Sequence, residues 1–143
     1  MGKQSRIVKF LLVVFIICLV VGILLYKYLS RDVYILDIPN SYNLDSIAVE
    51  SDKGINTTSD EAEMDDILKG LDDLNLKTQI ESIQDFPVNV SSLISIKFYY
   101  REDSALSLYV YEKNNRYYLE EPYNGIYKLD ENTYNYIINL VNN

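Results

Sequence analysis

An uncharged apolar run at residues 10–26 (FLLVVFIICLVVGILLY) constrains the fold of this chain more than any other feature. Ile7 and Val8 before the run and Tyr28 and Leu29 after it extend the apolar stretch beyond 20 positions, if the side chains of Lys9 and Lys27 reach out to the membrane surface. A helix of about 20 residues spans roughly 30 Å, the thickness of the hydrocarbon core of a bilayer. Tyr26 and Tyr28 stand where an interfacial aromatic belt is expected. The run therefore predicts a transmembrane helix over residues 10–29.

A cleaved signal peptide is the main alternative, because it also begins with a basic region. Its apolar core has roughly 7–15 residues and is followed by a small-x-small cleavage site. Here the apolar core is longer, and residues 26–30 (YKYLS) offer no such site. Cys18 suggests a lipid-modified cysteine, but residues 15–17 (FII) lack the small residue expected directly before one. We therefore expect an uncleaved signal-anchor, with Cys18 as an apolar filler.

The distribution of charge changes sharply after this run. Residues 1–31 contribute +5 to the formal net charge of −8, so the other 112 residues carry −13 from 21 acids and 8 bases. Three of the five N-terminal bases precede the apolar run and two follow it, which favours a cytoplasmic N-terminus. We expect a plasma-membrane protein with a basic cytoplasmic stub over 1–9, a signal-anchor over 10–29 and an extracytoplasmic domain over 32–143.

Residue counts exclude several kinds of functional site. The chain has no His, which excludes His-based catalytic triads and imidazole metal sites. Its single Cys excludes an intrachain disulfide and a thiolate zinc site. The acidic outer part repels phosphate backbones, so no nucleic-acid partner is expected. The acids between Asp60 and Asp73 lack the Asp-x-Asp-x-Asp-Gly pattern of calcium loops and are interpreted as a solvated helix face. We therefore expect neither a metal nor a cofactor.

Hydrophobic periodicity predicts two helices in the outer part. The first spans residues 59–73, where apolar residues recur at i, i+3, i+4 and i+7 after a Thr-x-x-Glu capping box at 58–61. The second follows a capping Asp130 and ends near the C-terminus. The two apolar stripes consist of Met64, Ile67, Leu68 and Leu71 in the first helix, and of Tyr134, Ile137, Ile138 and Val141 in the second.

Apolar alternation predicts the strands. They are expected at 33–38, 46–50, 94–100, 106–111 and 116–120, with a loop at 54–59, a turn at 101–104 and a hairpin loop at Asn114-Asn115. A short strand is also expected between the first helix and residue 94, and another after Pro122. Hairpin-linked strands with segregated helices indicate an α+β class. The predicted architecture is one transmembrane helix followed by a small domain with an antiparallel β-meander and two helices.

Tyrosine is concentrated in the C-terminal part of the chain, where ten of the 14 tyrosines lie between Tyr99 and Tyr136. Tyrosine is a good strand former, so these side chains could simply pack in the core of a small domain. On the other face they would form an exposed platform that stacks on sugars or packs against a peptide. The candidate binding residues on such a platform are Tyr117, Tyr118, Glu120, Tyr123, Asn124 and Tyr127.

No catalytic residue is predicted. Glu120 and Glu121 are adjacent, and adjacent residues of a strand point to opposite faces, so we do not expect them to converge as an acid/base pair. Gly125 is expected to supply the positive φ of the tight turn that follows. The chain contains no Ser-x-x-Lys, no Gly-x-Ser-x-Gly and no phosphate-binding glycine loop. We therefore expect a protein that is not an enzyme.

Two segments carry a resemblance to a known family. Residues 78–87 (TQIESIQDFP) and 117–127 (YYLEEPYNGIY) resemble Ser-Ile-x-Asp-x-Pro and Tyr-Tyr-x-Glu-x-Pro-Tyr-x-Gly-Ile-Tyr segments of a family of small exported or membrane-anchored proteins. That family belongs to low-GC Gram-positive bacteria and is catalogued as a domain of unknown function. Asp37-Ile38-Pro39 and Ser46-Ile47 are similar to its opening strands, so the resemblance covers about residues 33–140. Abundant Ile, Tyr, Asn and Lys, typical of an AT-rich genome, fit this source.

The resemblance implies no catalytic residues. Similar domains accompany membrane sensor peptidases, which by analogy implies a role in envelope sensing. We predict a single-pass envelope protein whose outer domain is a non-catalytic interaction module for a peptide, an envelope protein or a wall glycan. The alternative is a regulatory or immunity subunit that acts through its transmembrane helix on a membrane partner. A third hypothesis is a hydrolase that uses carboxylates without histidine.

Overall fold

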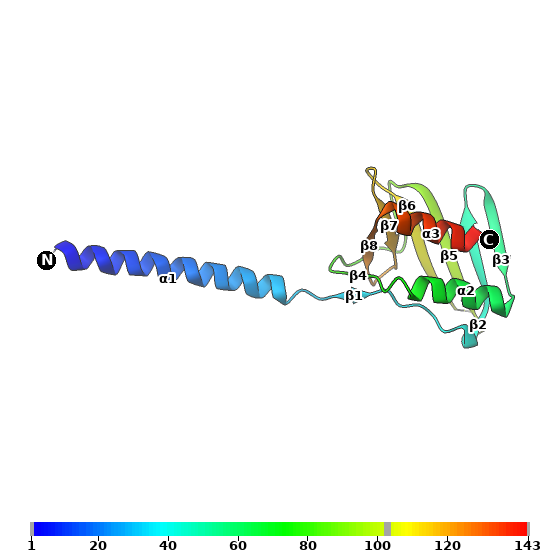
Figure 1. Cartoon of the computed structure of the whole chain (residues 1–143), viewed down its shortest axis with the longest axis horizontal. Helices are drawn as coiled ribbons and strands as arrows, with labels where there is room; N and C mark the ends of the chain where they lie inside the picture. Colours follow the sequence, from blue (N-terminus) through cyan, green and yellow to red (C-terminus); the bar gives the residue numbers. More distant parts are fainter. Residues whose placement is uncertain (1, 102–103, 143) are drawn as a thin grey trace. The chain divides into compact units, whose positions relative to one another are not determined.

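The computed structural model describes residues 2–101 and 104–142, and the chain forms two compact units, Met1–Asp32 and Val33–Asn143. The first unit contains the helix α1 (Gly2–Leu29) (Figure 1). Within α1, Val8–Leu29 is long and apolar enough to cross a membrane, a property that a signal sequence near the N-terminus shares. The side chains of this stretch are exposed. The sequence prediction of one long apolar helix at this end is confirmed.

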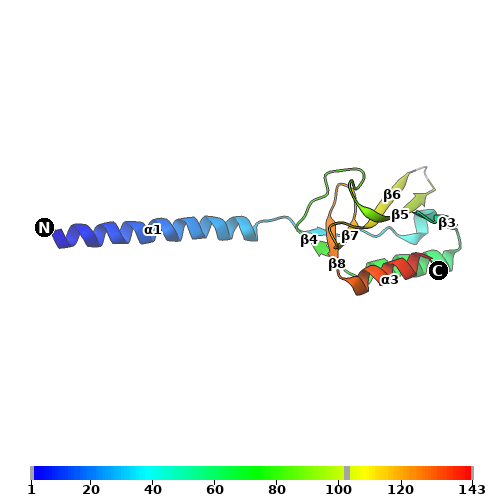
Figure 2. The same ribbon diagram turned by 90° about the horizontal axis from the view of Figure 1, so that it is seen from above.

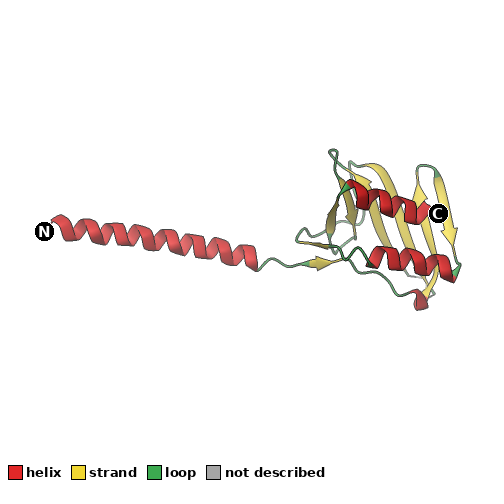
Figure 3. Ribbon diagram, in the orientation of Figure 1, coloured by secondary structure: helices red, strands yellow, loops and turns green. Residues whose placement is uncertain are grey.

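The second unit is an α+β domain, as the sequence predicts (Figure 3). A six-stranded antiparallel sheet has the strand order β3-β2-β5-β6-β7-β8, and β1 pairs with β4 in a separate two-stranded sheet. The meander β5-β6-β7-β8 is the predicted one, extended by a final strand. The elements are β1 (Tyr34–Ile35), the 3₁₀ turn η1 (Ser41–Asn43), β2 (Leu44–Ser51), β3 (Gly54–Thr58), α2 (Glu61–Asp72), β4 (Lys77–Thr78), β5 (Ser91–Tyr100), β6 (Ala105–Glu112), β7 (Tyr117–Glu120), β8 (Ile126–Leu129) and α3 (Glu131–Asn142).

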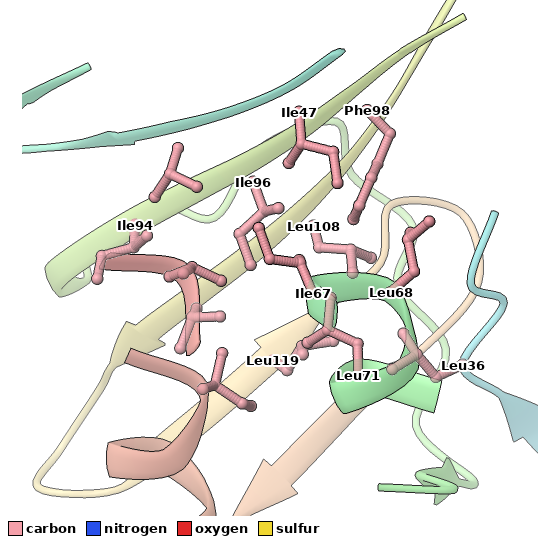
Figure 4. Close-up of a cluster of buried hydrophobic side chains, with 14 of the residues drawn as sticks. Leu36, Ile47, Ile67, Leu68, Leu71, Ile94, Ile96, Phe98, Leu108 and Leu119 are labelled. Atoms are coloured by element: carbon pink, nitrogen blue, oxygen red, sulfur yellow. The ribbon is translucent and has the colours of Figure 1, made fainter. Parts of the chain in front are cut away.

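The core lies between one face of the six-stranded sheet and the pair α2 and α3, which pack side by side (Figure 1) on that face (Figure 2). Both predicted apolar stripes face this core, and in α2 all four residues of the stripe are buried. In Figure 4, Ile67 and Leu71 of α2 lie against the layer formed by Ile96 and Leu108 of the sheet. Each fully buried side chain of this kind contributes roughly 1.5–3 kcal/mol, so this layer holds the helices on the sheet.

Strand β5 shows the alternation that separates the two faces of the sheet. Ile94, Ile96 and Phe98 are buried on the side of the helices, whereas Ser95 and Lys97 lie on the opposite side. The hairpin that joins β6 to β7 is also as predicted, because Asn114 and Asn115 adopt φ angles of 53° and 57°. Asparagine tolerates this left-handed conformation better than most residues.

The opposite face of the sheet is partly covered by residues 79–90, which we call the crossing loop (Figure 2). Phe86 of this loop contacts Tyr109 of β6, and the Lys113 ammonium donates a hydrogen bond to the carbonyl of Val88. Pro87 is fully buried. The crossing loop therefore closes a second, smaller packed layer on the helix-free side of β6, β7 and β8.

Three expectations from the sequence need correction. Residues 54–58, predicted as a loop, form strand β3, which pairs with β2 from Ile47↔Thr58 to Ser51↔Gly54. Its residues are mostly exposed, so it lacks the apolar alternation by which strands are recognised. The strand predicted at 33–38 is limited to Tyr34–Ile35, because only these residues pair with β4.

The third correction concerns the start of α2. The capping residue is Asp60, whose Oδ1 accepts the backbone N–H groups of Ala62 at 3.0 Å and Glu63 at 3.1 Å. Thr58 instead donates its hydroxyl to Glu63 Oε2 at 2.5 Å, so the predicted capping box is displaced. Asp130, by contrast, caps α3 as predicted, accepting the N–H of Thr133 at 2.8 Å. The turn predicted at 101–104 includes residues 102 and 103, which lie outside the described residues.

Candidate functional site

The tyrosines at the start of β7 lie on opposite faces of the sheet. Tyr117 stacks on Tyr134 of α3, with ring centroids 4.2 Å apart. Tyr118 stacks on Tyr111 of β6 at 5.6 Å, and it lies on the helix-free side because it pairs directly with that residue. The side chains of Tyr117 and Tyr118 are both half-buried. Their rings therefore join neighbouring elements and do not form one continuous platform.

Glu120 is the most buried ionisable residue described in the domain, with an exposure of 0%. Its Oε1 accepts a hydrogen bond from Ser82 Oγ at 2.6 Å, and its Oε2 accepts one from the Tyr111 hydroxyl at 2.8 Å. Burial raises the pKa of Tyr111, and the hydrogen bond to Glu120 raises it further. Because Ser82 belongs to the crossing loop, this carboxylate holds the loop on the sheet.

Glu121 is also buried and has a different set of partners. Its Oε2 accepts the backbone N–H of Asp37 at 3.1 Å and Asn124 Nδ2 at 2.6 Å. The Asn124 amide also donates to the carbonyl of Ile35 at 2.8 Å. Burial raises the pKa of Glu121, against the opposing effect of these two hydrogen bonds. Glu121 and Asn124 thus hold the segment around β1, and the two adjacent glutamates do not converge.

The turn after β7 differs from the prediction in its conformation. Tyr123 adopts the positive φ of 59°, and Gly125 does not. Tyr123 is 67% exposed and donates its hydroxyl to the Asp85 carboxylate of the crossing loop. Gly125 is required for close approach, since a Cβ there would lie 2.8 Å from Thr78 Cγ2 and 2.9 Å from the Tyr127 ring. The expectation that Gly125 supplies the positive φ is wrong.

Tyr127 lies in the hydrophobic core with an exposure of 1%, and its hydroxyl has no hydrogen-bond partner among the described residues. Burial raises the pKa of this hydroxyl. The expectation of one exposed platform is therefore wrong for Tyr127 and Glu120, which are both buried because alternate residues of β7 and β8 enter packed layers. Of the six candidate residues, Tyr123 is the one that is largely exposed.

A groove on the helix-free face of the sheet is a further candidate site. It has a volume of about 600 Å³ and lies over β2, β5 and β6, beside Phe86 of the crossing loop. The rings of Phe86 and Tyr109 meet edge to face, with centroids 5.2 Å apart, and form its aromatic wall. The lining residues are Glu50, Ser51, Asp52, Phe86, Ser92, Leu93, Ser95, Lys97 and Tyr109.

Ser95 is the distinctive residue of this groove. It is 6% exposed, and its Oγ has no hydrogen-bond partner among the described residues. Leaving a buried polar group unsatisfied costs about 1–3 kcal/mol, so such groups are rare in folded proteins. Ser95 lines the groove but its Oγ is buried, so a ligand there can supply the missing partner once the short side chain rotates toward the groove.

The charged side chains of the groove are arranged around one ion pair. Lys97 Nζ lies 2.8 Å from Glu50 Oε2, and this hydrogen bond raises the pKa of Lys97. Asp52, at the turn between β2 and β3, adds a second carboxylate. The lining therefore carries two negative charges and one positive charge. Among the described residues, no three His, Cys, Asp or Glu side chains form a group that could hold a metal ion.

The sequence does not identify this groove, because its residues come from four separated segments. Strand pairing brings them together, with Glu50 opposite Ser95 and Ser95 opposite Tyr109. The available signal was the polar side of the predicted strand at 94–100, where Ser95 and Lys97 alternate with buried apolar residues. Alternation places these side chains on one face, but only the register shows what lies beside them.

Comparison with known proteins assigns the domain to a family. Searches of curated proteins and of solved structures found no match to this chain. A family model named DUF5301, described as a domain of unknown function, matches residues 33–128. This range includes the groove and the segment 117–127, and it covers about two thirds of the chain. The expected resemblance to a domain of unknown function is thereby confirmed, and the chain belongs to the DUF5301 family.

Proposed function

We propose that this protein is a single-pass membrane protein whose outer domain, residues 32–143, is a non-catalytic binding module, and that the groove over β5 is its binding site. In this proposal residues 1–9 form a cytoplasmic stub and α1 anchors the domain in the plasma membrane. We also propose that the family consists of exported or anchored proteins of low-GC Gram-positive bacteria and that YYLEEPYNGIY is its signature.

The apolar helix and the charge distribution support the anchor. Val8–Leu29 is long enough to span a hydrocarbon core. At its end, the Arg31 guanidinium lies 5.9 Å from the centroid of the Tyr28 ring, a pair typical of a membrane–water interface. The basic residues near the N-terminus favour its retention in the cytoplasm. The acidic domain is then directed outward.

The single observation that carries the binding role is the unpartnered hydroxyl of Ser95 in the groove. A cavity of about 600 Å³ has the size of a small-ligand site, and its polar lining beside an aromatic wall suits a polar ligand. A nucleophilic serine requires a base within hydrogen-bond reach, and Ser95 Oγ has no such partner among the described residues. These features favour binding without catalysis.

Thermal unfolding of the full chain in lipid nanodiscs tests this function. Soluble fractions of enzymatically digested cell envelope are added to the wild type and to Ser95→Ala. We expect at least one fraction to raise the Tm of the wild type and to raise that of Ser95→Ala clearly less, because ligand binding stabilises the folded state. If each fraction shifts the Tm of both proteins equally, the groove is not the binding site.

A further inference from the structure

We propose that the groove binds a neutral, hydroxyl-rich glycan, with a sugar ring against Phe86 and a sugar hydroxyl on Ser95 Oγ. This inference rests on the proposed function, in which the groove is the binding site of the domain. It adds the chemical class of the ligand. This class follows from the aromatic wall of Phe86 and Tyr109, from the polar side chains of the lining, from the strand pairing of β5 and from the charges of the groove.

The wall of the groove suits the apolar face of a sugar ring. Phe86 is 50% exposed although it is a large aromatic residue, and Tyr109 contacts it edge to face. This contact fixes the orientation of the Phe86 ring, so the exposed part forms a rigid apolar surface. A pyranose presents one face of C–H groups and a rim of hydroxyls, and these match an apolar wall beside a polar floor.

The polar groups of the groove require a ligand that both donates and accepts hydrogen bonds. Ser95 Oγ can do either, whereas the carboxylates of Glu50 and Asp52 only accept. The Lys97 ammonium only donates. Hydroxyl groups serve all of these partners, because each is one donor and an acceptor with two lone pairs. A ligand with several hydroxyls around one apolar face therefore satisfies the groove.

The pairing of the strands disfavours an extended peptide. The groove lies on the face of the sheet, where β5 is paired with β2 on one side and with β6 on the other. A peptide recognised through its main chain adds to an open sheet edge, where unpaired N–H and C=O groups are available. In the six-stranded sheet the edge strands are β3 and β8, at the two ends of the strand order. Recognition in the groove therefore depends on side chains.

The charges of the groove disfavour an anionic ligand. The cation of the lining, Lys97, is already paired with Glu50, and Asp52 leaves the lining with a net negative charge. A uronic acid or a phosphate-bearing polymer would be repelled and would compete with Glu50 for the ammonium. A neutral or N-acetylated sugar avoids this repulsion.

The groove also has room for more than one sugar residue. A second hollow of about 230 Å³ shares Ser51, Asp52, Ser92 and Leu93 with the groove and extends toward Tyr134 of α3. The shared residues place the two hollows next to each other around the end of β2 and β5. The second hollow is also lined by Ile94 and Ile138 on the helix side of the sheet, so an oligosaccharide that enters both must bend around the end of β2 and β5.

The direct test is a binding titration of the full chain in nanodiscs, followed by saturation-transfer NMR. The probes are chitotetraose and cellotetraose as neutral oligosaccharides, tetragalacturonate as an anionic one, and two octapeptides, one basic and one neutral. We expect a neutral oligosaccharide to bind and tetragalacturonate to bind at least 10-fold more weakly. Absence of binding by both neutral oligosaccharides, or stronger binding of tetragalacturonate, overturns the assignment to a neutral glycan.

Three variants locate the binding site. Ser95→Ala is expected to weaken binding of the neutral oligosaccharide about 5-fold, the effect of one lost hydrogen bond. Phe86→Leu, which keeps an apolar contact with Tyr109, is expected to weaken it about 10-fold through the lost aromatic surface. Tyr127→Phe is the matched control, since it also removes a buried, unpartnered hydroxyl but lies outside the groove. Equal affinity for the wild type, Ser95→Ala and Phe86→Leu would overturn the proposal.

The outcomes separate this inference from the proposed function. If a peptide binds in place of the oligosaccharides, and Ser95→Ala weakens its binding, the groove is the binding site and the glycan assignment is wrong. If the envelope fractions give no Tm shift that depends on Ser95, the proposed function itself fails. Binding of a neutral oligosaccharide that depends on both Phe86 and Ser95 supports the two together.

Discussion

Ser82 Oγ donates a hydrogen bond to Glu120 Oε1 at 2.6 Å, joining two residues 38 positions apart in the chain. The next residue, Glu121, accepts the backbone N–H of Asp37, 84 positions away. Two consecutive carboxylates thus hold two distant segments, the crossing loop and the segment around β1, on the same end of β7. Glu120 and Glu121 therefore have a structural role, and the groove that we propose as the binding site lies elsewhere on the domain.

Glu120→Ala is expected to lower the free energy of unfolding by about 3 kcal/mol, because two hydroxyl donors lose their buried acceptor. The measurement is chemical unfolding followed by the near-UV circular dichroism of the tyrosines. Glu81→Ala, an exposed glutamate directly before Ser82 in the crossing loop, serves as the control and should change stability by less than about 0.5 kcal/mol. Equal effects of the two substitutions would contradict the role of Glu120.

Glu121→Gln is expected to change how stability depends on pH. Burial raises the folded-state pKa of Glu121 above its ordinary value of 4.5. At a pH between these two pKa values the protein therefore takes up a proton when it folds. The resulting stabilisation is complete below pH 4.5 and is lost as pH rises through the folded-state pKa. Because Oε2 alone accepts both hydrogen bonds, glutamine can retain them without the charge. The Tm of the wild type should therefore fall relative to that of the variant as pH rises from 4.5 to 7. A constant difference over this interval would show that Glu121 does not titrate anomalously.

Tyr127→Phe is expected to raise the free energy of unfolding by about 1 kcal/mol, since it removes a buried hydroxyl that has no partner among the described residues. Ser95→Ala should likewise leave the free protein at least as stable as the wild type. Thermal unfolding without ligand measures both effects. A loss of more than about 1 kcal/mol in either variant would reveal a hydrogen bond at that hydroxyl.

Gly125→Ala is expected to destabilise the domain by about 2 kcal/mol, because the new methyl group would overlap Thr78 and the buried ring of Tyr127. The comparison is Gly70→Ala on α2, where the added Cβ would lie 2.5 Å from Leu140 Cδ2 and 2.9 Å from the Tyr136 hydroxyl, two flexible side-chain ends that can move away, unlike the buried Tyr127 ring. That substitution also gains about 1 kcal/mol of helix propensity. Chemical unfolding should therefore show a clearly smaller loss for Gly70→Ala, and the reverse order would contradict the role of Gly125.

The proposed topology is tested by cysteine labelling in intact cells. Cys18 is the only cysteine of the chain, so Cys18→Ser provides a background without reactive thiols. In this background we expect Ser59→Cys, on an exposed site of the domain, to react with a membrane-impermeant maleimide. Gln4→Cys in the N-terminal stub should react only after lysis. Labelling of the stub in intact cells, with protection of the domain, would show that the orientation is the opposite of the proposed one.

Much of the domain could be predicted because local patterns dominate there. The stripe of Met64, Ile67, Leu68 and Leu71 specifies one buried helix face by spacing alone, and the structure buries all four. The hairpin at Asn114-Asn115 follows from the tolerance of asparagine for positive φ. Strand β3 and the crossing loop could not be predicted, because neither carries a local periodicity and both are placed by partners distant in the chain.

The sequence by itself determined the long apolar helix, the α+β class and the absence of histidine chemistry, since these depend on composition and on short-range spacing. Only the tertiary structure decided which tyrosines and glutamates are buried. Alternation assigns residues to one face or the other, but the crossing loop covers part of the helix-free face and leaves the rest open. Glu120 and Ser95 lie on that same face, and the loop encloses the first and leaves the second in a groove. The long-range packing of residues 79–90 therefore separates the structural centre of this domain from its candidate binding site.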